Sequence, residues 1–317
     1  MRLTTLIAST VLILAAPLSV AQPACGPVDK EALAWLDRMS RSLRETSYSG
    51  VFTYQHGGSI QAMRITHSVR GNVETEQVTR LSGAPSQVVR TEHPLDCIHP
   101  GNRLVRLGEA YQGGINDCGL SAHYRLKVGS VKRIAGRRAV MISVLPRDMY
   151  RYGYQMALDS ETGLLLKSQT MALDGRVLER FQFAEVKIGD VAPDGTQVDV
   201  IHEAEHSHVT TPAESTSSIA WGVGWLPEGF MLTAGSVNSP HDKTFTDGLA
   251  VFTVYLESMP RLAEPGEGHA REGGTTAYTR GLRITGEPTL VTVLGEVPIN
   301  TARRVADSIA WAGDSAN

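Results

Sequence analysis

Aromatic residues make up only 6% of this 317-residue chain, and no charge of one sign dominates it. The formal net charge is −3 and the sequence pI is about 6.4, so no overall basic field is present to attract nucleic acid. Hydrophobic residues at 42% and charged residues at 20% are ordinary for a globular protein. The length is sufficient for two domains.

The sequence also lacks the common motifs of catalysis. It has no glycine-rich phosphate loop, no G-x-S-x-G elbow and no pair of carboxylates in an arrangement that indicates catalysis. His202-Glu-Ala-Glu-His206 matches the H-E-x-x-H motif, which binds zinc only when both histidines share a helix face. Residues 197–201 alternate like a strand and Pro212 follows closely, so the context opposes a zinc protease. We expect a solvated linker, with adventitious metal binding by His202, His206 and His208 as an alternative, and a protein that is not an enzyme.

Cysteine is scarce, with three residues at positions 25, 97 and 118 and no C-x-x-C pair. A redox-active motif is therefore absent. Cys97 and Cys118 flank a Gly- and Pro-containing region, and in an oxidising compartment a disulfide between them would contribute roughly 3 kcal/mol. Two free thiols are the alternative.

The only long apolar run is Leu3–Leu18, which follows Arg2 and precedes Ser19-Val20-Ala21. This pattern predicts a signal peptide over residues 1–21 and a mature chain that starts near Gln22. A lipoprotein signal ending at Cys25 is the alternative, although Gln22-Pro23 is a poor lipobox. No later run approaches the length of a membrane span.

Short β-type runs fill the stretch from Ala139 to Val186, separated by turn residues. Asp174-Gly175 is the strongest short-range hairpin signal, and Gly163 suits a turn that needs a positive φ angle. Near the end of the stretch Phe181 and Phe183 alternate with polar residues, which indicates a sheet with one apolar face. The pattern predicts an antiparallel meander whose apolar face is covered by a helix, a second sheet or a ligand.

The chain before the meander is predicted to form a helix and further strands of the same sheet. Residues 28–45 carry an apolar stripe at helical spacing, and Asp29 is a suitable N-cap. Strands are expected from Gly50, and again over 73–81, 87–91 and 124–134. The apolar face of this sheet supplies candidates for a lipid pocket, with ordinary core packing as the alternative for each: Phe52, Tyr54, Met63, Ile65, Tyr154, Met156, Phe181 and Phe183.

A change in composition after Gly189 predicts a linker and a second domain. We assign residues 22–190 to a large domain, 191–217 to the linker, with one edge strand over 197–201, and 218–317 to a smaller C-terminal domain. In the smaller domain residues 249–257 and 289–294 indicate strands, and residues 301–310 indicate a short helix after Pro298.

Basic residues gather around one hairpin of the predicted sheet. The pattern fits either a solvated sheet edge or an anionic headgroup site beside the apolar face. The residues are Lys127, Lys132, Arg133, Arg137, Arg138, Arg147 and Arg151.

Several stretches in order along the chain resemble one known family. They are Tyr48-Ser-Gly-Val-Phe-Thr-Tyr54, Pro146-Arg-Asp-Met-Tyr-Arg-Tyr-Gly-Tyr154, residues 158–168, Leu178-Glu-Arg-Phe-Gln-Phe183, Trp225-Leu-Pro-Glu-Gly-Phe230, Asp247-Gly-Leu-Ala250 and residues 291–298. Together they resemble the RseB/MucB family, the periplasmic negative regulators of the sigma-E (AlgU-type) envelope-stress response. The resemblance covers nearly the whole mature chain.

This resemblance implies a mainly β, α+β fold in the periplasm. The large domain would be a curved antiparallel half-barrel covered by helices, like the lipoprotein carriers LolA and LolB, and the small domain would be α+β. Both would bind the periplasmic region of an RseA/MucA-type anti-sigma factor and protect it from site-1 proteolysis, with the small domain making the main contact.

Lipid or lipopolysaccharide in the large domain would oppose the complex with the anti-sigma factor. Trp225 and Phe230 are candidates for partner contact in the small domain. The family carries no catalytic residues, and no cofactor or metal is expected. A homo-oligomer is left open, and a periplasmic lipid or lipoprotein carrier of LolA/LolB type is the alternative function.

Overall fold

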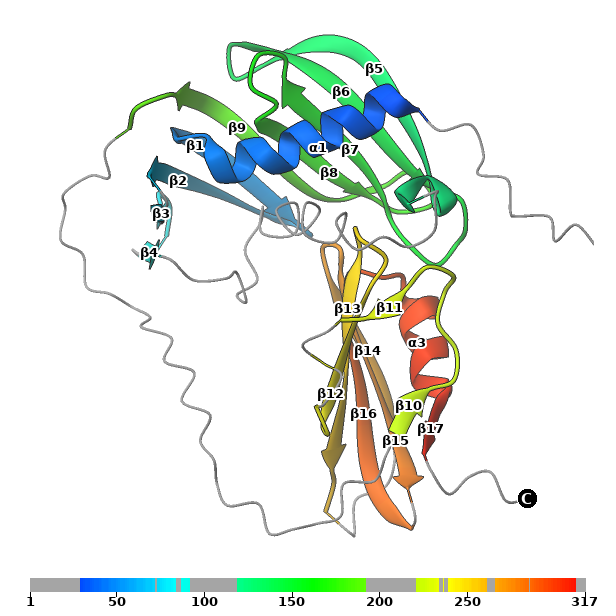
Figure 1. Cartoon of the computed structure of the whole chain (residues 1–317). Coiled ribbons are helices and arrows are strands. Elements are labelled where there is room, and N and C mark those ends of the chain that lie inside the picture. Colours follow the sequence, from blue (N-terminus) through cyan, green and yellow to red (C-terminus); the bar gives the residue numbers. More distant parts are fainter. Residues whose placement is uncertain are drawn as a thin grey trace, which may run out of the picture.

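The computed structural model describes residues 29–71, 73–83, 87–91, 119–191, 221–233, 236, 239–260, 266–284 and 286–311. The predicted signal peptide, the pair Cys97 and Cys118, and the linker with its H-E-A-E-H segment and edge strand lie outside these residues. None of the helices in the described ranges is both long and apolar enough to cross a membrane. We refer to described residues 29–191 as the large lobe and to described residues 221–311 as the small lobe (Figure 1).

A single antiparallel sheet of nine strands forms most of the large lobe. Its order is β4-β3-β2-β1-β9-β8-β7-β6-β5. The strands are β1 (Tyr48–His56), β2 (Ser59–Arg70), β3 (Val73–Arg80), β4 (Gln87–Thr91), β5 (Tyr124–Ile134), β6 (Arg137–Pro146), β7 (Gly153–Asp159), β8 (Leu165–Met171) and β9 (Val177–Ile188).

The sheet consists of two meanders joined along β1 and β9. Strands β1 to β4 and strands β5 to β9 each follow the predicted rule that a strand pairs with its neighbour in sequence. The joint does not follow this rule, because β1 pairs with β9 over the register from Tyr48↔Ile188 to His56↔Glu179. This pairing places Phe52 opposite both Met63 of β2 and Phe183 of β9.

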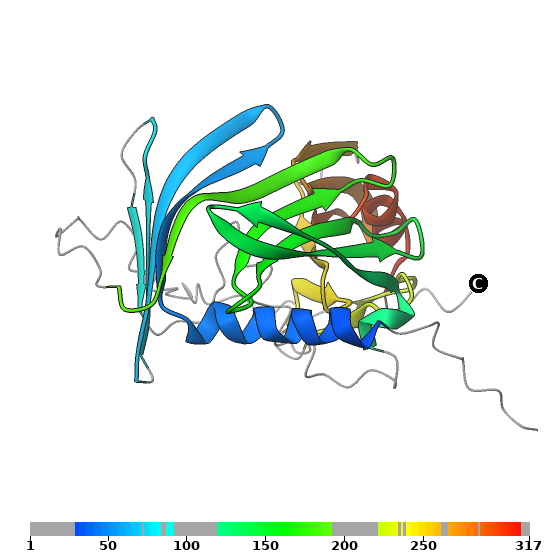
Figure 2. The same ribbon diagram turned by 90° about the horizontal axis from the view of Figure 1, so that it is seen from above.

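Helix α1 (Lys30–Glu45) lies on the concave side of the curved sheet (Figure 2). The predicted N-cap is confirmed, since the Asp29 side chain accepts a hydrogen bond from the backbone N–H of Ala32 at 3.0 Å. The predicted apolar stripe is buried at Leu36, Met39 and Leu43. The sequence resemblance implied several covering helices; within the described residues the large lobe has α1 and the short 3₁₀ helix η1 (Gly119–Ala122).

The two predicted turns of the meander are also confirmed. Gly163 and Gly175 both have a φ angle of +84°, a conformation that glycine adopts without a steric penalty. Gly175 lies between β8 and β9, and the backbone N–H of Gly175 donates to the carbonyl of Ala172 at 2.9 Å. The Asp-Gly pair therefore forms the hairpin that brings Phe181 and Phe183 back along β8.

The small lobe contains a six-stranded antiparallel sheet in the order β11-β12-β13-β16-β15-β14, and a two-stranded sheet of β10 and β17. Its helix α3 (Ile299–Asp307) packs on β15 and β16. The strands are β10 (Trp221–Val223), β11 (Met231–Leu232), β12 (Asp242–Thr246), β13 (Val251–Ser258), β14 (Glu267–Glu272), β15 (Thr275–Ile284), β16 (Glu287–Gly295) and β17 (Ile309–Trp311).

The predicted helix over residues 301–310 was wrong at its C-terminal end. Helix α3 stops at Asp307, and residues 309–311 instead form β17, which pairs with β10. Ala302 and Val305 are buried on the helix as expected, and Ile309 joins the same hydrophobic core from the strand. The apolar period continued past the helix end because both elements face one core.

Candidate functional site

The predicted lipid-pocket residues of β1, β2 and β9 share the concave face of the large sheet. Phe52 lies opposite Met63 and Phe183, while Tyr54 lies opposite Phe181. The ring centroids of Phe52 and Phe181 are 5.0 Å apart, and those of Phe181 and Phe183 are 5.2 Å apart. Tilted and edge-to-face aromatic contacts of this kind stabilise a sheet face beyond simple area burial.

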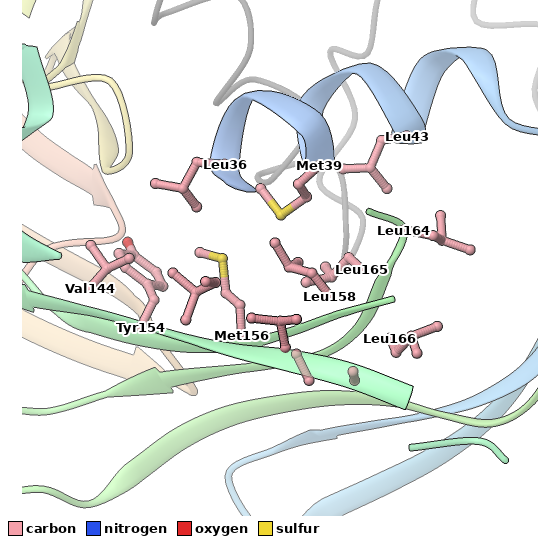
Figure 3. Close-up of a cluster of buried hydrophobic side chains, with 14 of the residues drawn as sticks. Leu36, Met39, Leu43, Val144, Tyr154, Met156, Leu158, Leu164, Leu165 and Leu166 are labelled. Atoms are coloured by element: carbon pink, nitrogen blue, oxygen red, sulfur yellow. The ribbon is translucent and has the colours of Figure 1, made fainter. Parts of the chain in front are cut away.

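Burial divides the eight pocket candidates into two groups. Phe52, Tyr154, Met156 and Phe183 are buried in the core cluster that includes Leu36, Met39 and Leu43 of α1. Figure 3 shows Met156 and Tyr154 on the sheet, on the side that faces Met39 and Leu36. This part of the concave face is a packed core.

The other four candidates are only partly buried and pack against the edge of that cluster. They are Tyr54, Met63, Ile65 and Phe181. These side chains keep part of their surface exposed, whereas the first four do not. The candidates therefore comprise a core group and an accessible group, which periodicity alone does not distinguish.

A buried ion pair joins the two lobes. Arg151, between β6 and β7, donates from Nη1 to Oδ2 of Asp247, between β12 and β13, at 2.7 Å, and both side chains are 0% exposed. Its Nη2 donates to the carbonyl oxygen of Glu228 at 2.6 Å. On the large-lobe side, Asp148 accepts from Arg151 at 2.9 Å.

Both carboxylate oxygens of Asp247 accept hydrogen bonds, and the donors come from both lobes. Its Oδ2 also accepts from the hydroxyl of Tyr124 at 2.9 Å, and its Oδ1 accepts from the backbone N–H groups of Leu249 and Ala250 at 2.9 and 2.8 Å. Burial of a charge is tolerated when the charge is paired and hydrogen-bonded in this way. The network therefore joins the lobes through a paired and fully hydrogen-bonded charge.

The electrostatics of the network favour its charged form. Burial alone lowers the pKa of Arg151, but the neighbouring Asp247 and Tyr124 and the hydrogen bond to Asp148 raise it, and the net pKa lies above its ordinary value. The pKa of Tyr124 is raised well above its ordinary value by burial first and by the Asp247 charge second. Arg151 also lies over the rings of Tyr124 and Phe230, at 5.5 and 5.2 Å from their centroids.

The turn that carries Asp247 also contributes an apolar side chain to the large lobe. Leu249 is 6% exposed and belongs to the core cluster formed by α1 and the large sheet. The core of the small lobe is a separate cluster. Leu249 is thus a residue of the small lobe that completes the core of the large one.

A second turn of the small lobe lies on the concave face. The backbone N–H of Gly274, between β14 and β15, donates to Glu179 Oε1 at 2.9 Å, and Glu179 is 8% exposed. Next to it, His56 Nδ1 and Glu272 Oε1 are 3.0 Å apart. Because Glu179 is two residues before Phe181 on β9, this turn lies at the end of the row of accessible pocket candidates.

The two candidates for partner contact, Trp225 and Phe230, lie where the lobes meet. The guanidinium of Arg304 is 4.1 Å from the Trp225 ring centroid, and the rings of Tyr150 and Trp225 are 5.0 Å apart. Phe230 is 5% exposed within the small-lobe core. In this arrangement a partner would reach the edge of Trp225 and would not reach Phe230.

The expectation of a single basic zone was wrong for two of its members. Arg151 is buried between the lobes, and Arg137 pairs with Asp159 at 2.7 Å and with Glu161 at 2.8 Å. Arg147 donates to the carbonyl of Ser121 at 3.1 Å. Lys127, Lys132, Arg133 and Arg138 remain exposed on β5 and β6.

Sequence reasoning missed the residues that join the lobes. The sequence pattern places Asp247 only in the segment Asp247-Gly-Leu-Ala250. It predicts Tyr124 and Glu179 only as strand residues. The single local signal was an acidic residue followed by glycine between two β-type runs, which predicts a turn but not its contacts.

These features define a two-lobed, mainly β binding protein, in which an apolar sheet face in one lobe contacts turns of the other. Within the described ranges, no three or more His, Cys, Asp or Glu residues are grouped to hold a metal ion. The sequence comparisons agree with this class: residues 31–203 match the MucB/RseB N-terminal domain and residues 215–310 match the MucB/RseB C-terminal domain.

Individual relatives support the same assignment. The chain is 35% identical over 292 residues to the sigma factor AlgU regulatory protein MucB of Pseudomonas aeruginosa, covering 88% of this chain and 90% of that protein. It is 26% identical over 293 residues to the sigma-E factor regulatory protein RseB of Haemophilus influenzae, covering 87% and 90%. The chain belongs to the MucB/RseB family of sigma-factor regulatory proteins, which are not enzymes.

Solved structures extend the match to the fold. A crystal structure of MucB in complex with MucA(peri) has a TM-score of 0.68 and 34% identity, covering 89% of this chain and 99% of that one. The complex of Pseudomonas aeruginosa MucA and MucB gives a TM-score of 0.69 and 32% identity, covering 89% and 99%.

Proposed function

We propose that this protein binds the periplasmic region of a MucA/RseA-type anti-sigma factor and protects it from the first proteolytic cut. The observation that carries the proposal is the similarity through both lobes to MucB, which has been solved as a complex with MucA(peri). By holding the anti-sigma factor intact, the protein would act as a negative regulator of a sigma-E/AlgU-type response.

The periplasm is the proposed location of this activity. The apolar run near the N-terminus and its small-x-small end predict export. The relative MucB has been crystallised in complex with MucA(peri). Export and partner thus support the same compartment.

Lipid or lipopolysaccharide is the proposed antagonist. The accessible group Tyr54, Met63, Ile65 and Phe181 presents apolar surface on the concave face, next to the turn at Gly274. An acyl chain gains roughly 0.8 kcal/mol for each CH₂ group it buries on such a surface. A ligand bound there would lie beside the contact between the lobes and would favour a different arrangement of them.

A lipid or lipoprotein carrier of LolA/LolB type is the competing function. A carrier would use the concave face but would have no use for the lobe that contributes Asp247 and Leu249. Crosslinking in the periplasm followed by co-purification separates the two functions. The regulator recovers one inner-membrane anti-sigma factor, whereas the carrier recovers many lipoproteins.

The direct test is protection of the partner. The purified mature protein is mixed with the periplasmic segment of the cognate anti-sigma factor, and cleavage by a DegS/AlgW-type protease is followed over time. The proposal expects cleavage to slow in proportion to the complex formed, and to recover when lipopolysaccharide is added. Cleavage at the same rate with saturating protein would refute the regulatory function.

A further inference from the structure

The turn from Asp247 to Ala250 is locally rigid. Two backbone N–H groups inside it donate to the Asp247 carboxylate, and the N–H of Gly248 donates to Oγ1 of Thr246 at 3.0 Å. Gly248 has a φ angle of +98°, which another residue would adopt only with strain. The turn is therefore expected to move as one piece with β12 and β13.

This rigid turn fills space in the core of the large lobe. Leu249 is buried in the same cluster as Met39 of α1 and Phe52 and Phe183 of the concave face. A close-packed cluster of this kind accepts extra carbon atoms only if a neighbouring element moves. The strands around it are held by continuous backbone ladders, whereas the turn enters from another lobe and is held by side-chain contacts.

Movement of the turn would be transmitted to the rest of the contact between the lobes. The carboxylate of Asp247 carries both the ion pair to Arg151 and the hydrogen bond from Tyr124. The second turn, at Gly274, depends on Glu179 of the same concave face. We therefore expect displacement of Leu249 to loosen both contacts, because both belong to the docked arrangement of the same lobe.

We propose that the Asp247–Ala250 turn couples ligand binding on the concave face to the position of the small lobe, and that Leu249 is the residue that the ligand displaces. An acyl chain that binds the accessible group and extends from it into the core cluster displaces Leu249, separates Asp247 from Arg151 and releases the small lobe from its docked arrangement. This inference rests on the proposed binding of a lipid to the concave face. It adds the residue through which that binding changes the arrangement of the lobes.

The test measures hydrogen–deuterium exchange of the full mature protein at the two turns. The reporting peptides cover residues 247–252 and 272–276, and a peptide covering 289–295 in β16 is the internal reference. Myristate is the probe, and its binding is measured separately by displacement of a fluorescent fatty acid. Binding of myristate to the wild type is expected to speed exchange at both turns about tenfold and to leave the reference unchanged.

Two substitutions at Leu249 extend the test, and the first of them needs no ligand. Leu249→Trp adds volume to the cluster and is expected to speed exchange at both turns about tenfold without myristate, because overpacking displaces the turn. Leu249→Ala removes volume, so myristate is expected to bind without faster exchange at Gly274. Val305→Ala, in the separate core of the small lobe and outside all three peptides, is the control for general loss of stability.

Each outcome decides between the claims. Slow exchange at both turns in Leu249→Trp, with near-ultraviolet circular dichroism showing a folded protein, refutes the inference. Equal acceleration in the reference peptide also refutes it, because the effect would then be global. Failure of myristate and lipopolysaccharide to bind the wild type refutes the proposed lipid function, while acceleration in ligand-free Leu249→Trp would still establish that Leu249 controls the docking of the lobes.

Discussion

Replacement of Arg151 by methionine probes the contact between the lobes most sharply. The guanidinium is 0% exposed, and it binds Asp247, Asp148 and the carbonyl of Glu228. Methionine preserves an unbranched apolar stem between the Tyr124 and Phe230 rings and removes only the charged head. The substitution thus leaves a buried carboxylate without its cation.

The expected loss in the free energy of unfolding follows from the contacts that each partner of Arg151 loses. Removal of one member of a buried ion pair costs about 3–5 kcal/mol. Asp247 keeps the hydroxyl of Tyr124 and two backbone N–H groups, and Asp148 has a 28% exposed side chain that can regain water. We therefore expect a loss of about 3 kcal/mol, at the lower end of that range.

Urea denaturation of Arg151→Met, followed by tryptophan fluorescence and circular dichroism, measures the loss. Because the chain has two lobes, the two signals are fitted separately. Arg176→Met is the control, since Arg176 and Asp174 pair on the surface with 63% and 53% exposed side chains, and we expect little measurable change there. If the urea midpoint of Arg151→Met were no lower than that of Arg176→Met, the ion pair between Arg151 and Asp247 would not stabilise the contact between the lobes. Adding Asp247→Asn should recover part of the loss, with a coupling energy of about 1–3 kcal/mol.

Three further predictions concern other contacts. Met39→Ala should lower the free energy of unfolding by about 2–5 kcal/mol in urea denaturation, because Met39 is 0% exposed on the buried face of α1. Gly229→Ala should speed hydrogen exchange of the backbone amides where the lobes meet, because its Cβ would clash with the His123 ring; unchanged exchange would contradict this. Burial first and the Arg151 charge second lower the pKa of His123, so its contribution to stability is complete above the ordinary pKa of histidine and is lost as the pH falls below that value. His123→Gln should flatten that slope in melting curves measured against pH, and an unchanged slope would assign it to other groups.

Local chemistry made much of the large lobe predictable. The cap at Asp29, the stripe through Met39 and the turn at Gly175 each depend on residues within a few positions of one another. Alternation predicted that Phe181 and Phe183 lie on one face, because side-chain direction in a strand follows from the backbone alone. These predictions needed no knowledge of distant contacts.

The features of the structure that the sequence did not predict depend on contacts between distant segments. Arg151 and Asp247 are 96 positions apart, and no periodicity indicates that one meets the other. Arg151 was therefore interpreted as one member of a surface basic zone. The pairing of β1 with β9 was missed for the same reason, and the strand β14 was missed because Glu267–Glu272 is almost entirely exposed and has no apolar alternation.

The most direct measurement of the account is a binding titration with two ligands. The purified mature protein is titrated with the periplasmic segment of its anti-sigma factor by calorimetry, with and without saturating lipopolysaccharide. We predict that lipopolysaccharide raises the Kd for the segment, and that the segment raises the Kd for lipopolysaccharide by the same factor, since coupling between two sites is reciprocal. Equal affinity for the segment with lipopolysaccharide bound would contradict the account.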